Sequence, residues 1–461
     1  MRDELEKNGE ESGLDRRSFL RLGTAAAAVS ALDQNLAYGQ TTRVPRENWS
    51  GTYHFHTDHV FQPQDAAAVA EEVRSTAKLR ALGTRHSFNG IADSTSAQIS
   101  TLGLKSVEVH AVSHSVRAGA GIRLGDLAIE IDKQGWALHN LPSLPHISLA
   151  GCISTGTHGS GVHNGNMSTA VREIEFVAAD GKLHKLSRAH DPATFPGAVV
   201  ALGALGVITN LTVDVQPRFE VAQVVYENLS FDQLESHLAE IMGAAYSVSL
   251  FTHWQDNRAT QVWLKHRATQ GAKPPMPATF YGATLADKKL HPVGREADAT
   301  PCTEQGGAPG PWYERLPHFK LAFTPSTGHE IQTEYFVPLD KGYEAIRAVE
   351  TLRDLITPHL LVTELRTIAA DDLWLSMAYQ RPSLAIHFTW KPEEAAVLEL
   401  IPQIEAKLAP FAPRPHWAKV FSIPKTQLEQ SYVRTKQFRD LVATYDPAGK
   451  FTNEFLRQVI L

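Results

Sequence analysis

The stretch GTRHSFN, Gly83 to Asn89, places a histidine inside a tight bend of small and polar residues. It follows the short apolar run LRAL (Leu79–Leu82), which predicts a buried strand. Ahead of that strand, PQDAAAVAEEVRSTAK predicts a helix that begins after Asp65, because its apolar residues recur every fourth position. His86 therefore interrupts a plain succession of helix and strand, and its presence there needs a reason.

The elements around this stretch predict an α+β region that ends near Pro217. KSVEVHAVSHSVRAG favours two paired strands, and RLGDLAIEIDKQG favours a helix with one apolar face. REIEFVAADGKLHKLS favours a hairpin that turns at Asp180 and Gly181. FPGAVVALGALGVITNLTVDVQP then predicts a short helix, a glycine turn and a strand. The strands of this region are expected to be mixed in direction.

The second half of the chain has a different rhythm, with an irregular segment rich in proline and glycine over residues 271–314. After it we expect a strand over 330–337, a helix over 342–356, strands over 360–370 and 384–390, a helix over 392–409 and a strand over 416–423. This β-α-β-β-α-β order favours an antiparallel sheet with its helices on one face. The other face of the sheet is then left free.

Polar side chains are predicted to share that free face, because residues two apart on a strand point the same way. The pairs, one on each of four strands, are Gln332 with Glu334, Glu364 with Arg366, His387 with Thr389, and Trp417 with Lys419. A solvated sheet surface would explain any single pair. Four such strands make a binding or catalytic surface an equal alternative.

A glycine-rich stretch, SLPHISLAGCISTGTHGSGVHNGN (Ser143–Asn166), would let the backbone approach a ligand closely. It lacks the dinucleotide fingerprint, the phosphate-binding loop with its lysine, and the serine elbow of hydrolases. A surface loop is the alternative, although few charges and flanking Leu and Ile indicate partial burial. His54, His56 and His59 cluster upstream, but no matching ligands accompany them, so no metal site is predicted.

Composition and the N-terminus restrict the class of protein. The net charge of −6 over 461 residues argues against a nucleic-acid partner. The two cysteines, Cys152 and Cys302, form no zinc or redox motif, and whether they pair stays open. Arg16 and Arg17, an alanine-rich run and a small-residue site near Gly39 predict a twin-arginine export signal over residues 1–39. We therefore expect a periplasmic or secreted protein with no membrane insertion after processing.

Taken together, these residues resemble the flavin oxidases of the vanillyl-alcohol-oxidase class, in the aldonolactone and alditol oxidase branch. The resemblance runs from about Asn48 to the C-terminus. It rests on stretches that match motifs of that family: GTRHSFN, SLPHIS, TGTHGSG, LGALGV, CTEQ, PGPWYERLPHF, AAYSVSLFT, HFTW, RPHWAKVF and DPAGKFTN. It implies a two-domain α+β flavoprotein, in which a PCMH-type FAD-binding domain precedes a cap domain with a large antiparallel sheet covered by helices on one face. The expected divisions are 46–217 for FAD binding, 218–415 for the cap and 416–461 for a segment that returns to the flavin.

The resemblance also implies the cofactor site. In this family the histidine of the G-x-x-H-S motif bonds covalently to the 8α-methyl carbon of the flavin, and here that residue is His86. A neutral imidazole nitrogen is a suitable nucleophile for this bond. The other implied FAD contacts are Ala81, Leu82, Gly83, Thr84, Arg85, Ser87, Ser143, Ser148, Gly151, Thr155, Gly156, Thr157, His158, Ile208 and His416.

For the substrate, the resemblance implies Ser143, Gln332, Glu364, Arg366, Thr389 and Lys419 as binding residues. The implied reaction oxidises the terminal alcohol of alditols such as xylitol and sorbitol, with glycerol as a further candidate, and reduces O2 to hydrogen peroxide. Lys419 is expected to act as the base, held partly neutral by Arg366, which would stabilise the alkoxide, while His387 relays the proton and Glu364 assists. A purely electrostatic role is the alternative for each of Lys419, Arg366 and His387. We expect a monomer.

Two alternatives stay open from the sequence. The first is an aldonolactone oxidase or dehydrogenase that acts on a sugar-1,4-lactone, since that group shares the HWAK and Glu-x-Arg motifs. The second is a non-catalytic sugar-binding protein. Three positions depart from the family pattern: Arg85 replaces a small residue, Cys152 stands where serine is commoner, and Pro142 lies where the polyol oxidases have alanine.

Overall fold

The stretch around His86 folds as its sequence predicts. Helix α2 (Ala66–Ser75) begins after Asp65, whose carboxylate accepts the Ala68 N–H at 2.8 Å. Strand β2 (Leu79–Leu82) follows and is buried, and the chain then turns through the GTRHSFN bend. In the parallel three-stranded sheet of this region, β2 pairs with β3 (Ala97–Ser100), which pairs with β1 (Val60–Phe61).

The computed structural model describes residues 45–268, 271–324 and 326–461. The expected export signal over residues 1–39 lies outside them. Residues 46–461 form one compact unit, and the domain divisions near 217 and 415 stay predictions. Over the described residues, no helix has the length and apolar character that a membrane span requires.

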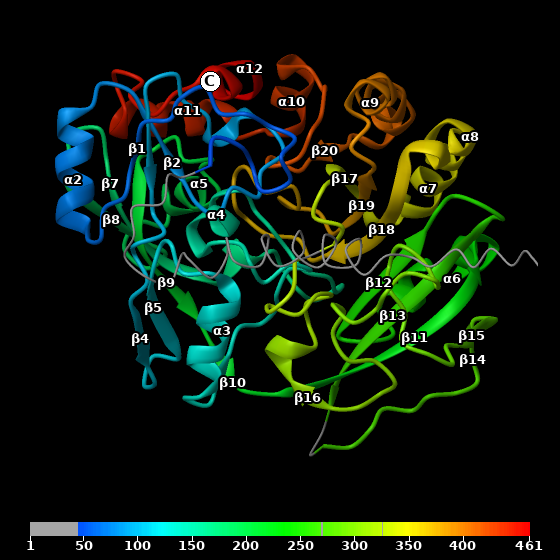
Figure 1. Ribbon diagram of the computed structural model, residues 1–461. Coiled ribbons are helices and arrows are strands. Elements are labelled where there is room, and N and C mark those ends of the chain that lie inside the picture. The colour runs from blue at the N-terminus through cyan, green and yellow to red at the C-terminus, as the bar shows by residue number, and fades with distance from the viewer. Residues whose placement is uncertain (1–44, 269–270, 325) are drawn as a thin grey trace, which may run out of the picture. The chain divides into compact units, whose positions relative to one another are not determined.

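A five-stranded antiparallel sheet completes the first region, as Figure 1 shows at the left. The paired strands, the helix and the hairpin predicted there are confirmed, and Gly181 supplies the positive φ (71°) of the hairpin turn. The sheet order is β4 (Val107–His110), β5 (Ser115–Gly119), β9 (Val207–Asp214), β7 (Val171–Val177) and β8 (Leu183–Ser187). The helices of this region are α3 (Leu124–Asp132), α4 (Leu149–Ser154) and α5 (Phe195–Val199), and β6 (Trp136–Ala137) pairs with β10 (Gln216–Pro217).

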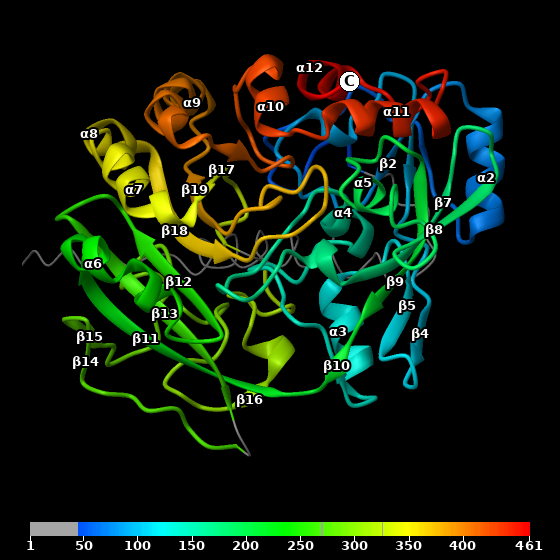
Figure 2. The same cartoon turned by 180° about the vertical axis from the view of Figure 1, so that it is seen from behind.

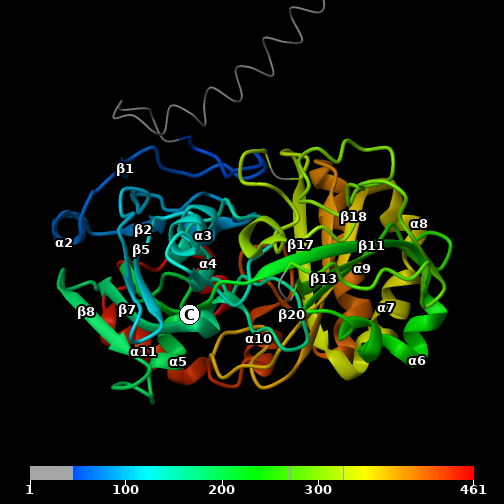
Figure 3. The ribbon, with the colours of Figure 1, turned by 90° about the horizontal axis from the view of Figure 1, so that it is seen from below.

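The second region is built on one antiparallel sheet, ten-stranded over the described residues. Its order is β14 (Thr279–Phe280), β15 (Ala283–Leu285), β11 (Glu220–Ser230), β13 (Arg258–Ala268), β12 (Ser247–Thr252), β18 (Leu360–Ile368), β19 (Ser383–Trp390), β17 (Ile331–Pro338) and β20 (Arg414–Pro415), with β16 (Gly310–Pro311) beside β11. Helices α6 (Phe231–Met242), α7 (Gly342–Glu350), α8 (Arg353–Ile356) and α9 (Glu394–Leu408) lie along one side of it (Figures 1 and 3). The predicted α+β class, with helices on one face of an antiparallel sheet, is confirmed.

Two details of the second region differ from the sequence prediction. Strand β11 was not predicted, because VAQVVY is buried on both faces and shows no alternation. The strand predicted over 416–423 is wrong: only β20 pairs with β17, and the chain then turns, with Lys419 N–H donating to His416 O at 3.0 Å. Trp417 points into the core, where its Nε1–H donates to Leu375 O at 2.7 Å.

The C-terminal helices α10 (Lys425–Ser431), α11 (Thr435–Tyr445) and α12 (Glu454–Val459) lie along the top of the molecule, and α11 and α12 reach the first region (Figures 1 and 2). Lys450 Nζ donates to Thr76 O at 2.7 Å, and Asn453 Nδ2 donates to Gly90 O at 2.8 Å. The end of the chain therefore anchors the segments on both sides of the GTRHSFN bend.

Arg80 is the centre of this anchoring. Its buried guanidinium donates to the carbonyl oxygens of Ile91, Leu202, Gly203 and Phe451, at distances of 2.5–3.0 Å. Burial lowers the pKa of this group to about 10, against the opposing charge of Asp446, so it stays protonated at neutral pH.

We expect Arg80→Met to lower the free energy of unfolding by about 3 kcal/mol, because it leaves several buried carbonyls without a donor. Reversible chemical or thermal unfolding measures the change. As a control, Arg295→Met removes an exposed arginine paired with Glu227 and Asp287 and should cost less than about 1 kcal/mol. Equal destabilisation by the two substitutions would contradict the assignment.

Candidate active site

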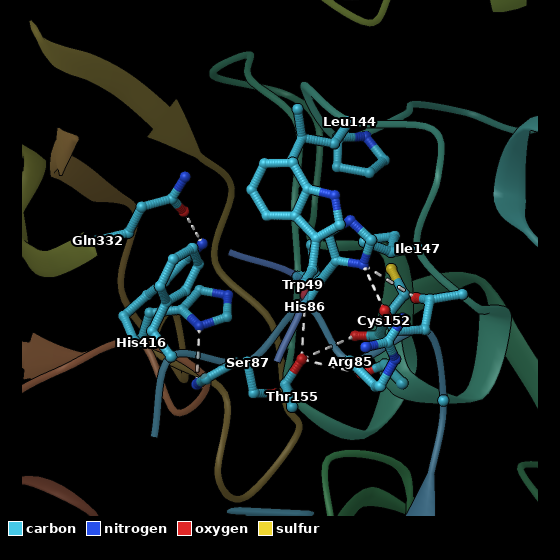
Figure 4. Close-up of a pocket in the computed structure, with 18 of the residues that line it drawn as sticks. Trp49, Arg85, His86, Ser87, Leu144, Ile147, Cys152, Thr155, Gln332 and His416 are labelled. Carbon is cyan, nitrogen blue, oxygen red and sulfur yellow. Dashed lines mark hydrogen bonds between the residues drawn. The ribbon is translucent and has the colours of Figure 1, made fainter. Parts of the chain in front are cut away.

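A cavity lies between the GTRHSFN bend, the glycine-rich stretch and the polar side of the ten-stranded sheet. Its wall therefore combines the segments expected to hold a cofactor with those expected to bind a substrate. Figure 4 shows Ile147, Cys152 and Thr155 on one side of it and Gln332 and His416 on the other. The sequence-predicted residues that line it are Ala81, Leu82, Gly83, Thr84, Arg85, His86, Ser87, Ser143, Ser148, Gly151, Thr155, Thr157, His158, Ile208, Gln332, Glu364, Arg366, His387, Thr389, His416 and Lys419.

His86 lies in the cavity wall, and its ring stacks on Trp49 with centroids 5.0 Å apart (Figure 4). One ring nitrogen, Nδ1, donates to Thr84 O at 3.0 Å, so the other nitrogen keeps its lone pair. That Nε2 atom is buried and has no hydrogen-bond partner among the described residues. Burial, with help from the charges of His146, Lys419 and Arg85, lowers the pKa of His86 to about 3. The imidazole is therefore neutral and nucleophilic at physiological pH.

The backbone beside His86 forms a cradle. An added Cβ at Gly83 would come within 2.3 Å of Ser148 Oγ, so only glycine fits there without a shift of Ser148. Thr84 Oγ1 accepts the Ser148 N–H at 3.1 Å, which ties the bend to the glycine-rich stretch. Arg85 adopts a positive φ of 64°, a conformation that favours the small residue expected at this position. This cradle and the unpartnered nitrogen of His86 fit a cofactor that approaches the backbone closely.

Part of the glycine-rich stretch is a buried helix, α4, and not a surface loop. Gly156, which follows α4 at φ 67°, does not line the cavity and instead faces Met377 and Val200. The implied FAD contact of Gly156 stays a prediction. Cys152 lines the cavity while Cys302 is buried outside it, and within the described part of the chain both are free.

The polar face predicted from strand alternation is a buried cluster and not a solvated surface. In the register, Gln332 pairs with Thr389 across β17 and β19, while His387 pairs with Glu334 on one side and with Glu364 on the other. Antiparallel partners place their side chains close together on one face. Glu334, which the sequence placed on this face without assigning it a role, is 1% exposed and lines the cavity.

Arg366 holds the two carboxylates of this cluster. It donates to Glu334 Oε1 at 2.6 Å, lies 3.5 Å from Glu364 Oε2 and donates to Ser143 Oγ at 3.2 Å, so it joins the two halves of the cavity. Burial by itself would raise the pKa of each carboxyl, but Arg366 and neighbouring histidines keep both values well below the ordinary range. Both carboxylates are therefore ionised.

Lys419 reaches the cavity from the turn after β20 and not from a strand. Its Nζ donates to Gln332 Oε1 and lies 4.7 Å from the centre of the Phe88 ring. Burial lowers the pKa of Lys419 to about 8; Glu334 and Glu330 oppose this change, and Arg366 adds to it. This shift has the direction that partial neutrality requires, although burial contributes more to it than the predicted neighbour, Arg366.

The histidines complete the site. His387 is kept neutral by burial, which lowers its pKa, and its Nε2 finds no hydrogen-bond partner in residues 45–268, 271–324 and 326–461. His158 Nε2 lies 3.2 Å from Glu334 Oε1, close to His416. The ring nitrogens of these two histidines and a Glu334 oxygen lie close enough to ligate a metal ion, but Arg366 already donates to the same carboxylate oxygen.

Two residues that line the cavity, Trp49 and His318, were not predicted as site residues. The one sequence signal for His318 was its place in the PGPWYERLPHF motif.

Comparison with known proteins decides the family. Residues 57–187 match the FAD binding domain family, and residues 324–459 match the D-arabinono-1,4-lactone oxidase family. The chain is 42% identical over 419 residues to an alditol oxidase of a Streptomyces species, with 90% of this chain and 98% of the relative covered. The chain belongs to the alditol oxidase branch of the vanillyl-alcohol-oxidase flavoproteins. It is thus an FAD-dependent oxidoreductase, and the fit of the cradle to a cofactor agrees with this.

More distant relatives of this flavoprotein are named as lactone oxidases or lactone dehydrogenases. It is 26% identical to an L-gulonolactone oxidase of Mus musculus and to an L-gulono-1,4-lactone dehydrogenase of Mycobacterium tuberculosis, with 90% of this chain and 97% and 98% of those chains covered. Among solved structures, a cholesterol oxidase from B. sterolicum superimposes with a TM-score of 0.70 at 14% identity, covering 90% of this chain and 96% of that one. At that identity the likeness shows the fold alone.

Proposed function

We propose that the protein is an alditol oxidase, which oxidises the terminal alcohol of polyols such as xylitol and sorbitol at an FAD bound covalently through His86. The observation that carries the substrate class is the polar lining of the cavity. Hydroxyl, amide, carboxylate and ammonium groups of Ser143, Gln332, Glu364, Thr389 and Lys419 lie on the cavity that also exposes His86. An uncharged, densely hydroxylated molecule needs such a set of donors and acceptors.

When bound, FAD would accept a hydride equivalent from the alcohol carbon and pass two electrons to O2, giving hydrogen peroxide. The chain supplies the proton chemistry. Lys419, whose pKa of about 8 leaves a neutral fraction at physiological pH, takes the proton of the reacting hydroxyl. The permanent charge of Arg366 stabilises the oxygen as that proton leaves, and neutral His387 can accept a hydrogen bond through its unpartnered nitrogen.

The covalent attachment rests on His86. Its neutral imidazole, its unpartnered buried nitrogen and its position in the wall of the cavity are what an alkylation of the ring requires. Ser87 and Thr84 flank it in the cradle, and Trp49 holds the ring plane. A bond at this position also prevents loss of the cofactor after export.

Three further proposals accompany this function. The protein is exported by the twin-arginine route to the periplasm or the medium, it acts as a monomer, and O2 is its electron acceptor. The motif at Arg16 and Arg17 supports the first, because that route carries folded proteins that already hold their cofactors.

A substrate panel tests the proposed function against the lactone alternative. Purified protein is assayed for peroxide with xylitol, sorbitol, glycerol and L-gulono-1,4-lactone, in parallel with reduction of an artificial dye. We expect kcat/KM for xylitol or sorbitol to exceed that for the lactone by about tenfold or more, because the relative at 42% identity is an alditol oxidase while the lactone enzymes are at 26%. Preference for the lactone would overturn the substrate class, and dye reduction without peroxide would indicate a dehydrogenase.

A further inference from the structure

Two buried residues continue from Glu364: a histidine, His318, which also lines the cavity, and a lysine, Lys265, which lies behind it. His318 Nε2 lies 2.7 Å from Glu364 Oε1, and Lys265 Nζ lies 3.0 Å from His318 Nδ1. Glu364, His318 and Lys265 are 4%, 5% and 1% exposed. They come from β18, the loop before β17 and β13, so segments far apart in the chain converge on this line. None of the alcohol chemistry described above uses His318 or Lys265.

The hydrogen bonds assign one tautomer to His318. An ionised carboxylate only accepts, so His318 donates through Nε2–H and keeps a lone pair on Nδ1. Lys265 donates to that lone pair, and its other two N–H groups donate to Leu316 O at 2.5 Å and Pro317 O at 3.2 Å. The three donors of the ammonium therefore meet three acceptors, and the imidazole is held in one tautomer.

The consequence for Glu364 is an asymmetry between its two oxygens. His318 satisfies Oε1, whereas the donors nearest to Oε2 are Arg366 Nε at 3.5 Å and His387 Nδ1 at 3.9 Å. Both distances exceed those of good hydrogen bonds to oxygen. Since Glu364 lines the cavity, Oε2 is the oxygen that can accept a hydrogen bond from a ligand.

We propose that His318 and Lys265 are positioning residues of the oxidation site, which hold the Glu364 carboxylate so that Oε2 receives a hydroxyl of the substrate. This role rests on the proposed function. Burying a lysine costs desolvation free energy, and an apolar side chain would fill the same space without that cost. The position of Lys265 beside the histidine that contacts Glu364 is explained by the proposed role. The rings of Phe251 and Trp263 pack edge-to-face with the His318 ring and restrict its plane.

The charges around the pair keep His318 neutral. Burial lowers its pKa to about 4, Lys265 and Arg366 add to this change, and Glu364 opposes it. Burial lowers the pKa of Lys265 to about 7, with Glu364 and Cys302 opposing and Arg366 adding to the change. Loss of the Lys265 charge should therefore raise the pKa of His318.

Kinetics of two substitutions at His318 test the role. His318→Phe removes the donor to Glu364, and we expect kcat/KM for xylitol to fall about 10- to 100-fold, the range for a lost hydrogen bond to a charged group. His318→Gln offers an amide N–H and should recover much of that loss. The control His237→Gln changes a half-exposed histidine of α6 that contacts Glu240 Oε2; neither residue lines the cavity, and this variant should stay within about twofold of the wild type. Thermal melts establish that each variant is folded, and a folded His318→Phe within twofold of the wild type overturns the proposal.

A second measurement needs no substrate. Histidine ¹⁵N NMR of the holoprotein, with His318 assigned from the His318→Phe variant, should show the Nε2–H tautomer and no protonation from pH 8 to pH 5. In Lys265→Met the apparent pKa of His318 should rise. The Nδ1–H tautomer in the wild type, or an unchanged titration in Lys265→Met, overturns the proposal. If the wild type oxidises no polyol, the proposed function fails and this role with it, while the NMR result still shows whether the pair is formed.

Discussion

Replacing His86 by alanine should give a protein whose yellow colour no longer survives acid precipitation. The wild-type pellet should retain its flavin, because the cofactor would be bonded to the imidazole, whereas alanine offers no nucleophile for that bond. The measurement is the visible absorbance of pellet and supernatant after precipitation, together with fluorescence of the denatured protein on a gel. We also expect a large loss of peroxide formation, since the cofactor would be held by noncovalent contacts alone, among them the cradle of Gly83, Thr84 and Ser148.

The matched control is His59→Ala, which removes an exposed histidine of the same region that does not line the cavity. It should keep both the colour of the pellet and the activity. Flavin that remains in the precipitated His86→Ala pellet would contradict the assignment of His86. Flavin that is released from the wild type by acid would contradict covalent attachment altogether.

Replacing Lys419 by methionine should lower kcat/KM for xylitol by ~10²–10⁴-fold, the usual contribution of a positioned base. Lys419 acts as a base only when it is neutral, and its folded pKa of about 8 lies below the ordinary value of a lysine. In the wild type, kcat/KM should therefore rise with pH up to about 8 and level off above it, as the ammonium loses its proton. The Lys419→Met variant should lose this ascending limb.

Lys419→Arg separates a base from a charge. Arginine keeps a positive charge beside Gln332 but does not give up its proton in the working range of pH, so this variant should be as inactive as Lys419→Met. If Lys419→Arg retains most of the activity, the lysine acts only through its charge. In that case His387 becomes the group that takes the proton.

The same pKa shift has a consequence for stability. Because the folded pKa of Lys419 is lowered relative to the unfolded chain, the unfolded state binds the proton more tightly. This group therefore destabilises the fold more as the pH falls from the unfolded pKa toward about 8. Lys265, with a folded pKa of about 7, acts in the same direction over a wider range of pH.

Local patterns in the sequence predicted most of the elements. Apolar periodicity and the cap at Asp65 gave α2, and alternation gave the strands β17, β18 and β19. The failures have physical causes. Strand β11 is buried on both faces, so its sequence does not alternate between apolar and polar residues. Residues 416–419 do alternate, but they form a turn in which Trp417 is buried in the core.

Residues of the site could be predicted from local patterns only where two of them lie on the same strand. Alternation placed Glu364 beside Arg366 and His387 beside Thr389, and the antiparallel register then brought the pairs together. The contact of Ser143 with Arg366 joins positions 223 residues apart, and the pair of His318 with Lys265 joins positions 53 apart. No local pattern encodes such contacts, so for Ser143 the prediction came from the family resemblance alone. Alternation did place Lys419 on the polar face, but on a strand that the structure does not contain.

Anaerobic addition of xylitol to the purified holoprotein shows whether this cavity presents a polyol to a bound flavin. Visible absorbance is recorded before the addition, after it and after admission of air. We expect the yellow absorbance to bleach with xylitol and to return with air, with formation of peroxide. A protein that shows no flavin absorbance, or whose spectrum stays unchanged with xylitol, sorbitol and glycerol, would contradict the proposed function.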